Sequence, residues 1–184
     1  MQTVTGKAIR EGAQYKDIKE LVLDVRNRFA NMDAFVFRRQ PDEAEIHKTY
    51  KDFGYDVEYI ALALADLGLA GTHLSVVGEN SYEWMVSYSA ILGGGSIGVP
   101  LDRLLPENEV INLLKRGKVR AVFYHPNHHD MMVSIASIID SDDALQVDYF
   151  ICMDPDRIKS QWPESSAFIS FSSFIEKGKS LAED

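Results

Sequence analysis

Residues 74–102, LSVVGENSYEWMVSYSAILGGGSIGVPLD, decide the fold of this chain. The stretch opens with an apolar run, LSVV, which is typical of a buried strand and ends at a glycine. Asn80 then stands where a helix N-cap is expected, and Glu83 three residues later completes the pattern of a capping box. The helix ends at the glycine run 93–95, where the backbone can reverse, and a second apolar strand, IGVPL, follows. Two strands joined by a helix form a βαβ unit, which predicts a parallel sheet.

The segments on either side continue the alternation of helices and strands. Apolar residues spaced three and four apart indicate amphipathic helices, whereas short apolar runs between turn residues indicate strands. We expect helices at residues 18–32, 53–67, 106–116, 131–139 and 172–181, and strands at residues 34–37, 45–50, 120–124 and 149–153. The predicted fold is α/β: a mostly parallel sheet flanked by helices, with an N-terminal helix and an antiparallel hairpin.

Turn and cap residues mark where several of these elements begin and end. Thr49 and Asp52 form a second capping-box pattern, at the start of the second helix. Pro106 is expected at the first position of its helix, and Gly117 is expected to terminate that helix.

The length of the chain, 184 residues, suits one domain. Residues 1–16 are polar and without periodicity, and we interpret them as a flexible N-terminal arm. Residues 17–160 form the predicted α/β domain. Residues 161–184 are interpreted as a linker and a short helix, because the serine-rich run SSAFISFSS at 165–173 has a β-prone segment but neither the glycine nor the lysine of a phosphate loop.

Composition excludes several classes of partner. Lys and Arg number 19 against 28 Asp and Glu, which gives a net charge of −9. Nucleic acids and anionic membranes attract clustered positive charge, so neither is expected as a partner. No apolar run approaches the roughly 20 residues of a membrane span. The single cysteine, Cys152, cannot form an intramolecular disulfide and indicates a reducing compartment, so we expect a soluble cytoplasmic domain.

Three patterns invite a functional interpretation, and each has a simpler one. The glycines at 93–98 end a helix and open a strand, the reverse of a phosphate loop, which favours a tight turn. His125, His128 and His129 are spaced so that two of them could bind a metal from one face of a helix, but the sequence offers no third ligand at a comparable spacing. Solvated histidines at a helix start are therefore favoured, and no metal site is predicted. Cys152 lies in an apolar run, which indicates a buried, inert thiol.

Polar residues at the ends of the expected strands are the remaining candidates for ligand binding. Glu79, Asn80, Asp102 and Asp154 follow strands, and ligands of open α/β sheets gather at the carboxyl ends of strands. Helix caps and turn-forming residues occupy the same places. We therefore keep Glu79, Asn80 and Asp102 as weak binding candidates and assign no catalytic residue.

The central stretch also resembles a known family. GENSYEW and AILGGGSIGVPLD within residues 78–102 resemble the AMP-forming acyl-CoA synthetases, a family of adenylate-forming enzymes. The resemblance extends to TYKDF at 49–53, to the helix end before Gly68, and to AVF at 121–123. The form GENS-x-EW looks most like bacterial long-chain fatty-acid CoA ligases. Departures from the family pattern occur at Arg103, Gly117 and Ser96, which affect turns and packing more than chemistry.

The resemblance implies a function for a longer protein. Such an enzyme would use ATP and Mg²⁺ to convert a carboxylate into an acyl-adenylate, and would then transfer the acyl group to CoA. The family's phosphate loop would follow soon after the position of residues 174–179, so the chain resembles an N-terminal subdomain of the large domain. We expect this piece to bind no cofactor and to lack ligase activity. A sheet edge or face left uncovered by such a piece would favour self-association.

Two alternatives remain open at this point. The chain could be a stand-alone doubly wound module that binds a nucleotide or a protein partner. It could equally belong to an adenylating enzyme for amino or aryl acids, because by the resemblance the residues that choose among acids lie outside the chain.

Overall fold

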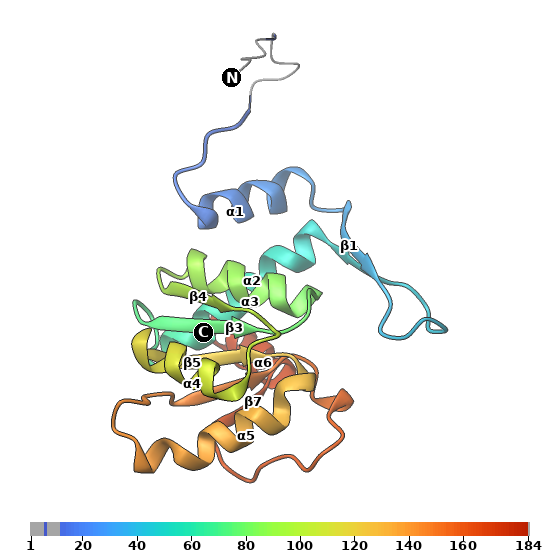
Figure 1. Ribbon diagram of the computed structural model, residues 1–184. Coiled ribbons are helices and arrows are strands. Elements are labelled where there is room, and N and C mark those ends of the chain that lie inside the picture. Colours follow the sequence, from blue (N-terminus) through green and yellow to red (C-terminus); the bar gives the residue numbers. More distant parts are fainter. Residues whose placement is uncertain (1–5, 7–11, 184) are drawn as a thin grey trace.

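The computed structural model describes residue 6 and residues 12–183, which form an α/β fold (Figure 1). The helices are α1 (Ile18–Arg28), α2 (Tyr50–Asp66), α3 (Tyr82–Gly93), α4 (Glu107–Arg116), α5 (His129–Ile138) and α6 (Phe171–Glu183). The strands are β1 (Asp33–Phe37), β2 (Ile46–Thr49), β3 (His73–Val77), β4 (Ile97–Leu101), β5 (Val119–Tyr124), β6 (Tyr149–Cys152) and β7 (Phe168–Ser170). The predicted flexible arm falls largely on residues 1–5 and 7–11, outside the described residues.

Five strands form a parallel sheet in the order β4-β3-β5-β6-β7. The βαβ unit is present as predicted, since β3 and β4 pair in parallel and α3 connects them. At the carboxyl end of the sheet, Val77 of β3 lies between Leu101 of β4 and Tyr124 of β5. The antiparallel pair β1 and β2 stands apart as a hairpin, so the predicted fold class is confirmed.

Helices cover both faces of the sheet. Residues of α1, α2, α3 and α6 share one apolar core with β3, β5 and β6, including the fully buried Ile60, Leu74 and Phe123. The second core lies on the opposite face, where α4 and α5 pack on the sheet through residues such as Leu114 and Met132. Figure 1 shows α1 to α3 on one side, α4 and α5 on the other, and the hairpin projecting from the body. Between residues 12 and 183, no helix is both long and apolar enough to cross a membrane.

The start of α3 differs from the sequence prediction by one residue. Ser81, not Asn80, is the N-cap, and its hydroxyl oxygen accepts a hydrogen bond from the main-chain N–H of Trp84 at 3.1 Å. Asn80 is exposed in the loop before it. Glu83 therefore does not close a capping box, and its carboxylate pairs with Arg39 of the hairpin instead. The pattern misled because both Asn and Ser are good caps and stand side by side.

Other element ends follow the sequence more closely. The capping box of Thr49 and Asp52 at the start of α2 is confirmed, as is the termination of α4 at Gly117. Pro106 precedes its helix as the N-cap and is not the first helical residue. The glycine run forms the turn between α3 and β4, with Gly94 as the C-cap of α3.

The serine-rich run contains more structure than the linker interpretation included. Phe168 to Ser170 form β7, which pairs in parallel with β6 and extends the sheet. Phe168 is buried in one core, and Phe171 and Phe174 of α6 are buried in the other. The aromatic residues explain the difference, because burying three phenylalanine rings outweighs the turn preference of the serines around them. The domain boundaries given above stay a prediction.

Candidate functional site

The strand order creates a place where two crossover connections leave the sheet in opposite directions. After β3 the chain passes through α3 on one face to reach β4, and after β5 it passes through α5 on the other face to reach β6. The carboxyl ends of the neighbouring strands β3 and β5 lie at this switch point. Ligands of open α/β sheets bind at such points, because the loops diverge there and leave a crevice.

A cavity of about 470 Å³ opens at this end of the sheet. It is lined by the hairpin residues 35–39, by residues 79–83 of the loop and helix start after β3, and by His125, Asn127 and Arg157 from beyond β5 and β6. Its size falls in the range of small-molecule sites. The cavity therefore joins four segments that are far apart in the sequence.

Gly78 allows the loops after β3 and β5 to approach closely. Its φ angle is +139°, a conformation that residues with side chains rarely adopt, and a Cβ atom at this position would collide with the Cβ of His125. The main-chain N–H of His125 donates to the carbonyl of Val77 at 3.0 Å, which fixes the two loops together. Glu79 and His125 are adjacent in space as a result.

Glu79, His125 and His128 form a cluster in which one possible metal-ligand atom of each side chain lies within 4.8 Å of the other two. His125 Nδ1 lies 2.9 Å from Glu79 Oε2, and the Asn127 side-chain amide donates to Glu79 Oε1 at 3.1 Å. Burial alone would raise the pKa of Glu79, but the Asn127 hydrogen bond and the nearby histidines bring it below its ordinary value. Burial lowers the pKa of His125, which favours a neutral imidazole.

The expectation of solvated histidines is wrong. His125, His128 and His129 are exposed by only 6%, 7% and 2%. His129 is a core residue: its ring nitrogens contact Tyr124 Oη at 2.9 Å and the Gln161 carbonyl at 3.3 Å. The fold brings a third side chain of metal-ligand chemistry, Glu79, beside them from the end of a neighbouring strand.

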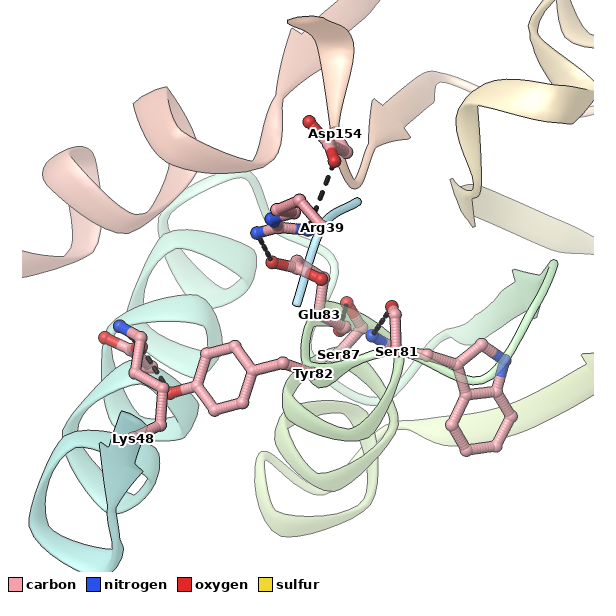
Figure 2. A network of polar contacts seen from close by, with 9 residues as sticks. Arg39, Lys48, Ser81, Tyr82, Glu83, Ser87 and Asp154 are labelled. Atoms are coloured by element: carbon pink, nitrogen blue, oxygen red, sulfur yellow. Dashed lines mark hydrogen bonds and ion pairs between the residues drawn. The ribbon is translucent and has the colours of Figure 1, made fainter. Parts of the chain in front are cut away.

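A second set of polar contacts anchors the hairpin beside the cavity (Figure 2). Arg39 Nη2 pairs with Glu83 Oε1 of α3, and Arg39 Nη1 donates to Asp154 Oδ2 after β6 at 3.1 Å. The side chain of Glu83 is only 6% exposed, so its charge needs this partner. Burial raises the pKa of Asp154, although Arg39 opposes the shift.

Tyr82, next to Glu83, continues this network on the other side of α3. Its hydroxyl donates to Asp56 Oδ2 of α2 at 2.6 Å, and the same oxygen lies 3.3 Å from Lys48 Nζ of β2. The ammonium group also lies 5.0 Å from the centre of the Tyr82 ring. These contacts join the hairpin, α2 and α3 beside the cavity.

The candidates from the sequence have different environments. Glu79 and Asn80 line the cavity. Asp102 is exposed, and its Oδ1 accepts from the main-chain N–H of Leu104 at 2.9 Å, the contact of a turn-forming residue. Sequence reasoning missed Arg39, His125 and Arg157 as cavity residues. Only the position of His125 directly after a predicted strand carried a signal.

The cavity offers binding groups but, among the described residues, no activated nucleophile. Cys152 is buried, as expected, and burial raises the pKa of its thiol to about 11, so the reactive thiolate is disfavoured. Arg39 is held by two carboxylates, and Ser81 caps a helix. The arrangement suits recognition and positioning more than bond making.

Comparison with known proteins identifies a family whose sequence model matches most of the chain. The sequence model of the family described as AMP-binding enzyme matches residues 24–173. No curated protein sequence matches the chain significantly.

Solved structures show where the fold recurs. The anthranilate CoA ligase AuaEII, in complex with anthranoyl-AMP, is 21% identical with a TM-score of 0.69, over 88% of this chain and 28% of that one. The A-PCP didomain of a carboxylic acid reductase from Segniliparus rugosus, in complex with AMP, is 13% identical with a TM-score of 0.70, over 91% and 27%. The fatty acyl CoA synthetase of Mycobacterium tuberculosis is 21% identical with a TM-score of 0.66, over 84% and 32%. The chain thus spans between 27% and 32% of these structures.

Proposed function

The chain belongs to the AMP-binding enzyme family, and from this premise we propose that it forms the N-terminal part of an ATP-dependent, AMP-forming acyl-CoA ligase. The single observation that carries the proposal is the family match over residues 24–173, which includes the central βαβ unit. The same fold in structures with anthranoyl-AMP and AMP supports it. The activity belongs to the longer protein, because the chain spans less than a third of those structures.

The proposed reaction has two steps. A carboxylate oxygen attacks the α-phosphorus of ATP, and pyrophosphate leaves to give an acyl-adenylate. The CoA thiolate then attacks the acyl carbon, and AMP leaves. Activation is needed because a carboxylate is a poor electrophile until one of its oxygens belongs to a good leaving group.

We propose a long-chain fatty acid as the substrate. The form of the segment after β3, GENSYEW, supports this choice, as does the shared fold with a fatty acyl CoA synthetase. An aryl acid is the second candidate, because an anthranilate CoA ligase has the same fold with a similar TM-score of 0.69. An amino acid is a third.

Within this enzyme, residues 12–183 act as a scaffold. The two ion pairs of Arg39 and the Tyr82–Asp56 contact fix the side chains along one side of the cavity. Because the cavity lies at the switch point, it is open to the rest of the protein. Magnesium, which the family reaction uses, does not fit the donors of the Glu79 cluster, because Mg²⁺ prefers oxygen ligands to imidazole. No magnesium-dependent step is assigned to these residues.

We also propose a cytoplasmic location, which the net charge of −9 and the single cysteine support.

The test is release of pyrophosphate by the full-length protein with ATP, CoA and one acid at a time. Palmitate, benzoate and a mixture of amino acids represent the three acid classes. We expect turnover with palmitate and little with the others. Turnover only with benzoate or with amino acids would reject the fatty-acid proposal, and no turnover with any acid would reject the ligase proposal.

A stand-alone nucleotide-binding module is the competing function. The switch-point cavity beside β3 and β5 favours it, because nucleotides bind at such points in other doubly wound sheets. A module of this kind would bind ATP or AMP without further chain. A thermal shift with ATP or AMP, measured on the 184-residue chain, would favour the module over the ligase part.

A further inference from the structure

Among the described residues, two of three clustered side chains at the switch point have lone pairs without partners. Glu79 follows β3, and His125 and His128 follow β5, so two neighbouring strand ends contribute to one cluster. Both histidines are more than nine-tenths buried. Within the described residues, Glu79 Oε2 and His128 Nδ1 are buried and have no hydrogen-bond partner. Such unsatisfied atoms are rare in folded proteins and indicate a missing ligand, ion or water.

The ring orientation of His128 makes Nδ1 a ligand atom. Nε2 lies 3.0 Å from the carbonyl oxygen of Arg103, which can only accept a hydrogen bond, so the proton is on Nε2. Nδ1 therefore carries a free lone pair, and one ring nitrogen of His128 lies within 4.8 Å of a ligand atom of Glu79 and of His125. A main-chain carbonyl that holds the second ring nitrogen is the usual support of a metal-bound histidine.

Arg103 Nη1 lies 4.0 Å from Glu79 Oε1, but in the described part of the chain the contact between Glu79 Oε2 and His125 has no such cation beside it. His125 Nδ1 accepts from the main-chain N–H of Asn127 at 3.3 Å, yet the same atom lies 2.9 Å from Glu79 Oε2. Two acceptor atoms at this distance repel unless a proton or a cation lies with them. The Asn127 amide holds the other carboxylate oxygen at 3.1 Å and so directs Oε2 toward the histidines.

We propose that Glu79, His125 and His128 together bind one divalent transition-metal ion of the zinc type. Two imidazoles and one carboxylate match the donor set of zinc sites with three protein ligands and an open fourth position. Glu79 and His125 also line the cavity, so the open position is available to water or to an anionic ligand entering there. The ion would tie the end of β3 to the end of β5. This site is independent of the proposed ligase activity.

The test is titration of the metal-free 184-residue chain with Co²⁺ while visible absorption is recorded, followed by competition with Zn²⁺. Cobalt is the probe because its absorption reports the ligand number and type. We expect saturation at one equivalent with the bands of four-coordinate cobalt, and their loss as Zn²⁺ is added. Absence of saturable binding at one equivalent would overturn the proposal and leave a shared proton as the explanation of the Glu79–His125 contact.

Variants locate the site. Glu79→Gln and His128→Gln are each expected to weaken Zn²⁺ binding at least about tenfold. The control is His47→Gln, which changes an exposed histidine 2.8 Å from Asp33 and should bind as the wild type does. Circular dichroism checks folding; if His128→Gln does not fold, Glu79→Gln decides, because that side chain is 35% exposed. Wild-type affinity in Glu79→Gln would overturn the assignment.

Discussion

At the scale of single residues, Arg39 connects more of the molecule than any neighbour in the hairpin. Its guanidinium group contacts a carboxylate of α3 and a carboxylate after β6, so three segments meet at one side chain. Buried Glu83 depends on it, and its second oxygen has no hydrogen-bond partner in the described residues. The hairpin is thereby fixed over the cavity that it helps to line.

Replacing Arg39 should destabilise the fold. Arg39→Ala leaves the buried Glu83 carboxylate without its cation, and we expect a loss of about 2 kcal/mol in the free energy of unfolding, measured by urea denaturation. Arg38→Ala is the matched control: Arg38 pairs with Glu45, and both side chains are 49% exposed. Exposed pairs contribute less than about 1 kcal/mol. Equal losses in the two variants would contradict the role given to Arg39.

The sequence could identify single residues of the site but not their partners. Glu79 is identified as a polar group at a strand end, whereas His125, which follows another predicted strand, is interpreted as a solvated histidine at a helix start. Their contact requires that β3 and β5 be neighbours, which local patterns do not specify because strand order is set by long-range packing. The burial of His125, His128 and His129 was missed for the same reason. Local polarity predicts exposure to solvent, whereas their contacts are with Glu79, Arg103 and Gln161, which follow other strands.

At the scale of elements, α6 packs against α2 at an unusually close contact. A Cβ atom at Gly178 of α6 would collide with the main-chain carbonyl of Tyr59 in α2. Backbone cannot move aside as a flexible side chain can. The glycine therefore sets the distance between the two helices that lie on the same face of the sheet.

A pair of glycine substitutions tests this contact. Gly178→Ala should lower the free energy of unfolding by about 1–3 kcal/mol through overpacking, although alanine is the better helix former. Gly93→Ala, at the end of α3, is the control, because the nearest atom to its Cβ would be 3.7 Å away. We expect that variant to be neutral or slightly more stable. Stabilisation by Gly178→Ala would show that the helices are not in close contact.

The capping box of α2 predicts a pH dependence. Partial burial would raise the pKa of Asp52, but hydrogen bonds from the Thr49 hydroxyl and main-chain N–H hold it below its ordinary value. The stabilisation from ionised Asp52 is therefore complete above the unfolded-state pKa of about 4, and is lost as the pH falls through the lower folded-state pKa.

Unfolding measurements between about pH 6 and pH 3 can detect this effect. The wild type should be more stable than Asp52→Ala by about 1 kcal/mol at pH 6, and the difference should shrink below about pH 4. A difference that stays constant over this range would show that the ionised carboxylate does not contribute to the cap.

Elements were more predictable than contacts, for physical reasons. Periodicity located α2 and α4, and the capping box marked the start of α2, because the 3.6-residue repeat and the N-cap hydrogen bond are local properties. Residues 168–170 were harder, since a three-residue strand has too few positions to show alternation and its serines favour turns. These residues form a strand because they pair with β6, and that pairing depends on the assembled sheet.

At the scale of the whole molecule, β4 is an edge strand that pairs only with β3 in the described sheet. Ile97 at its start is 51% exposed. Open edges with apolar side chains favour pairing between chains, so the 184-residue chain is expected to self-associate. Light scattering should show a mass that rises with concentration, and Ile97→Lys should reduce the rise. A constant monomer mass at high concentration would exclude this edge as an association site.

We propose that this chain is the scaffold part of a ligase whose bond-making groups lie in the rest of the protein. The most direct test compares pyrophosphate release by the full-length protein and by the 184-residue chain, with ATP, CoA and palmitate under identical conditions. We expect turnover by the full-length protein and none by the 184-residue chain. Turnover by the 184-residue chain alone would contradict it.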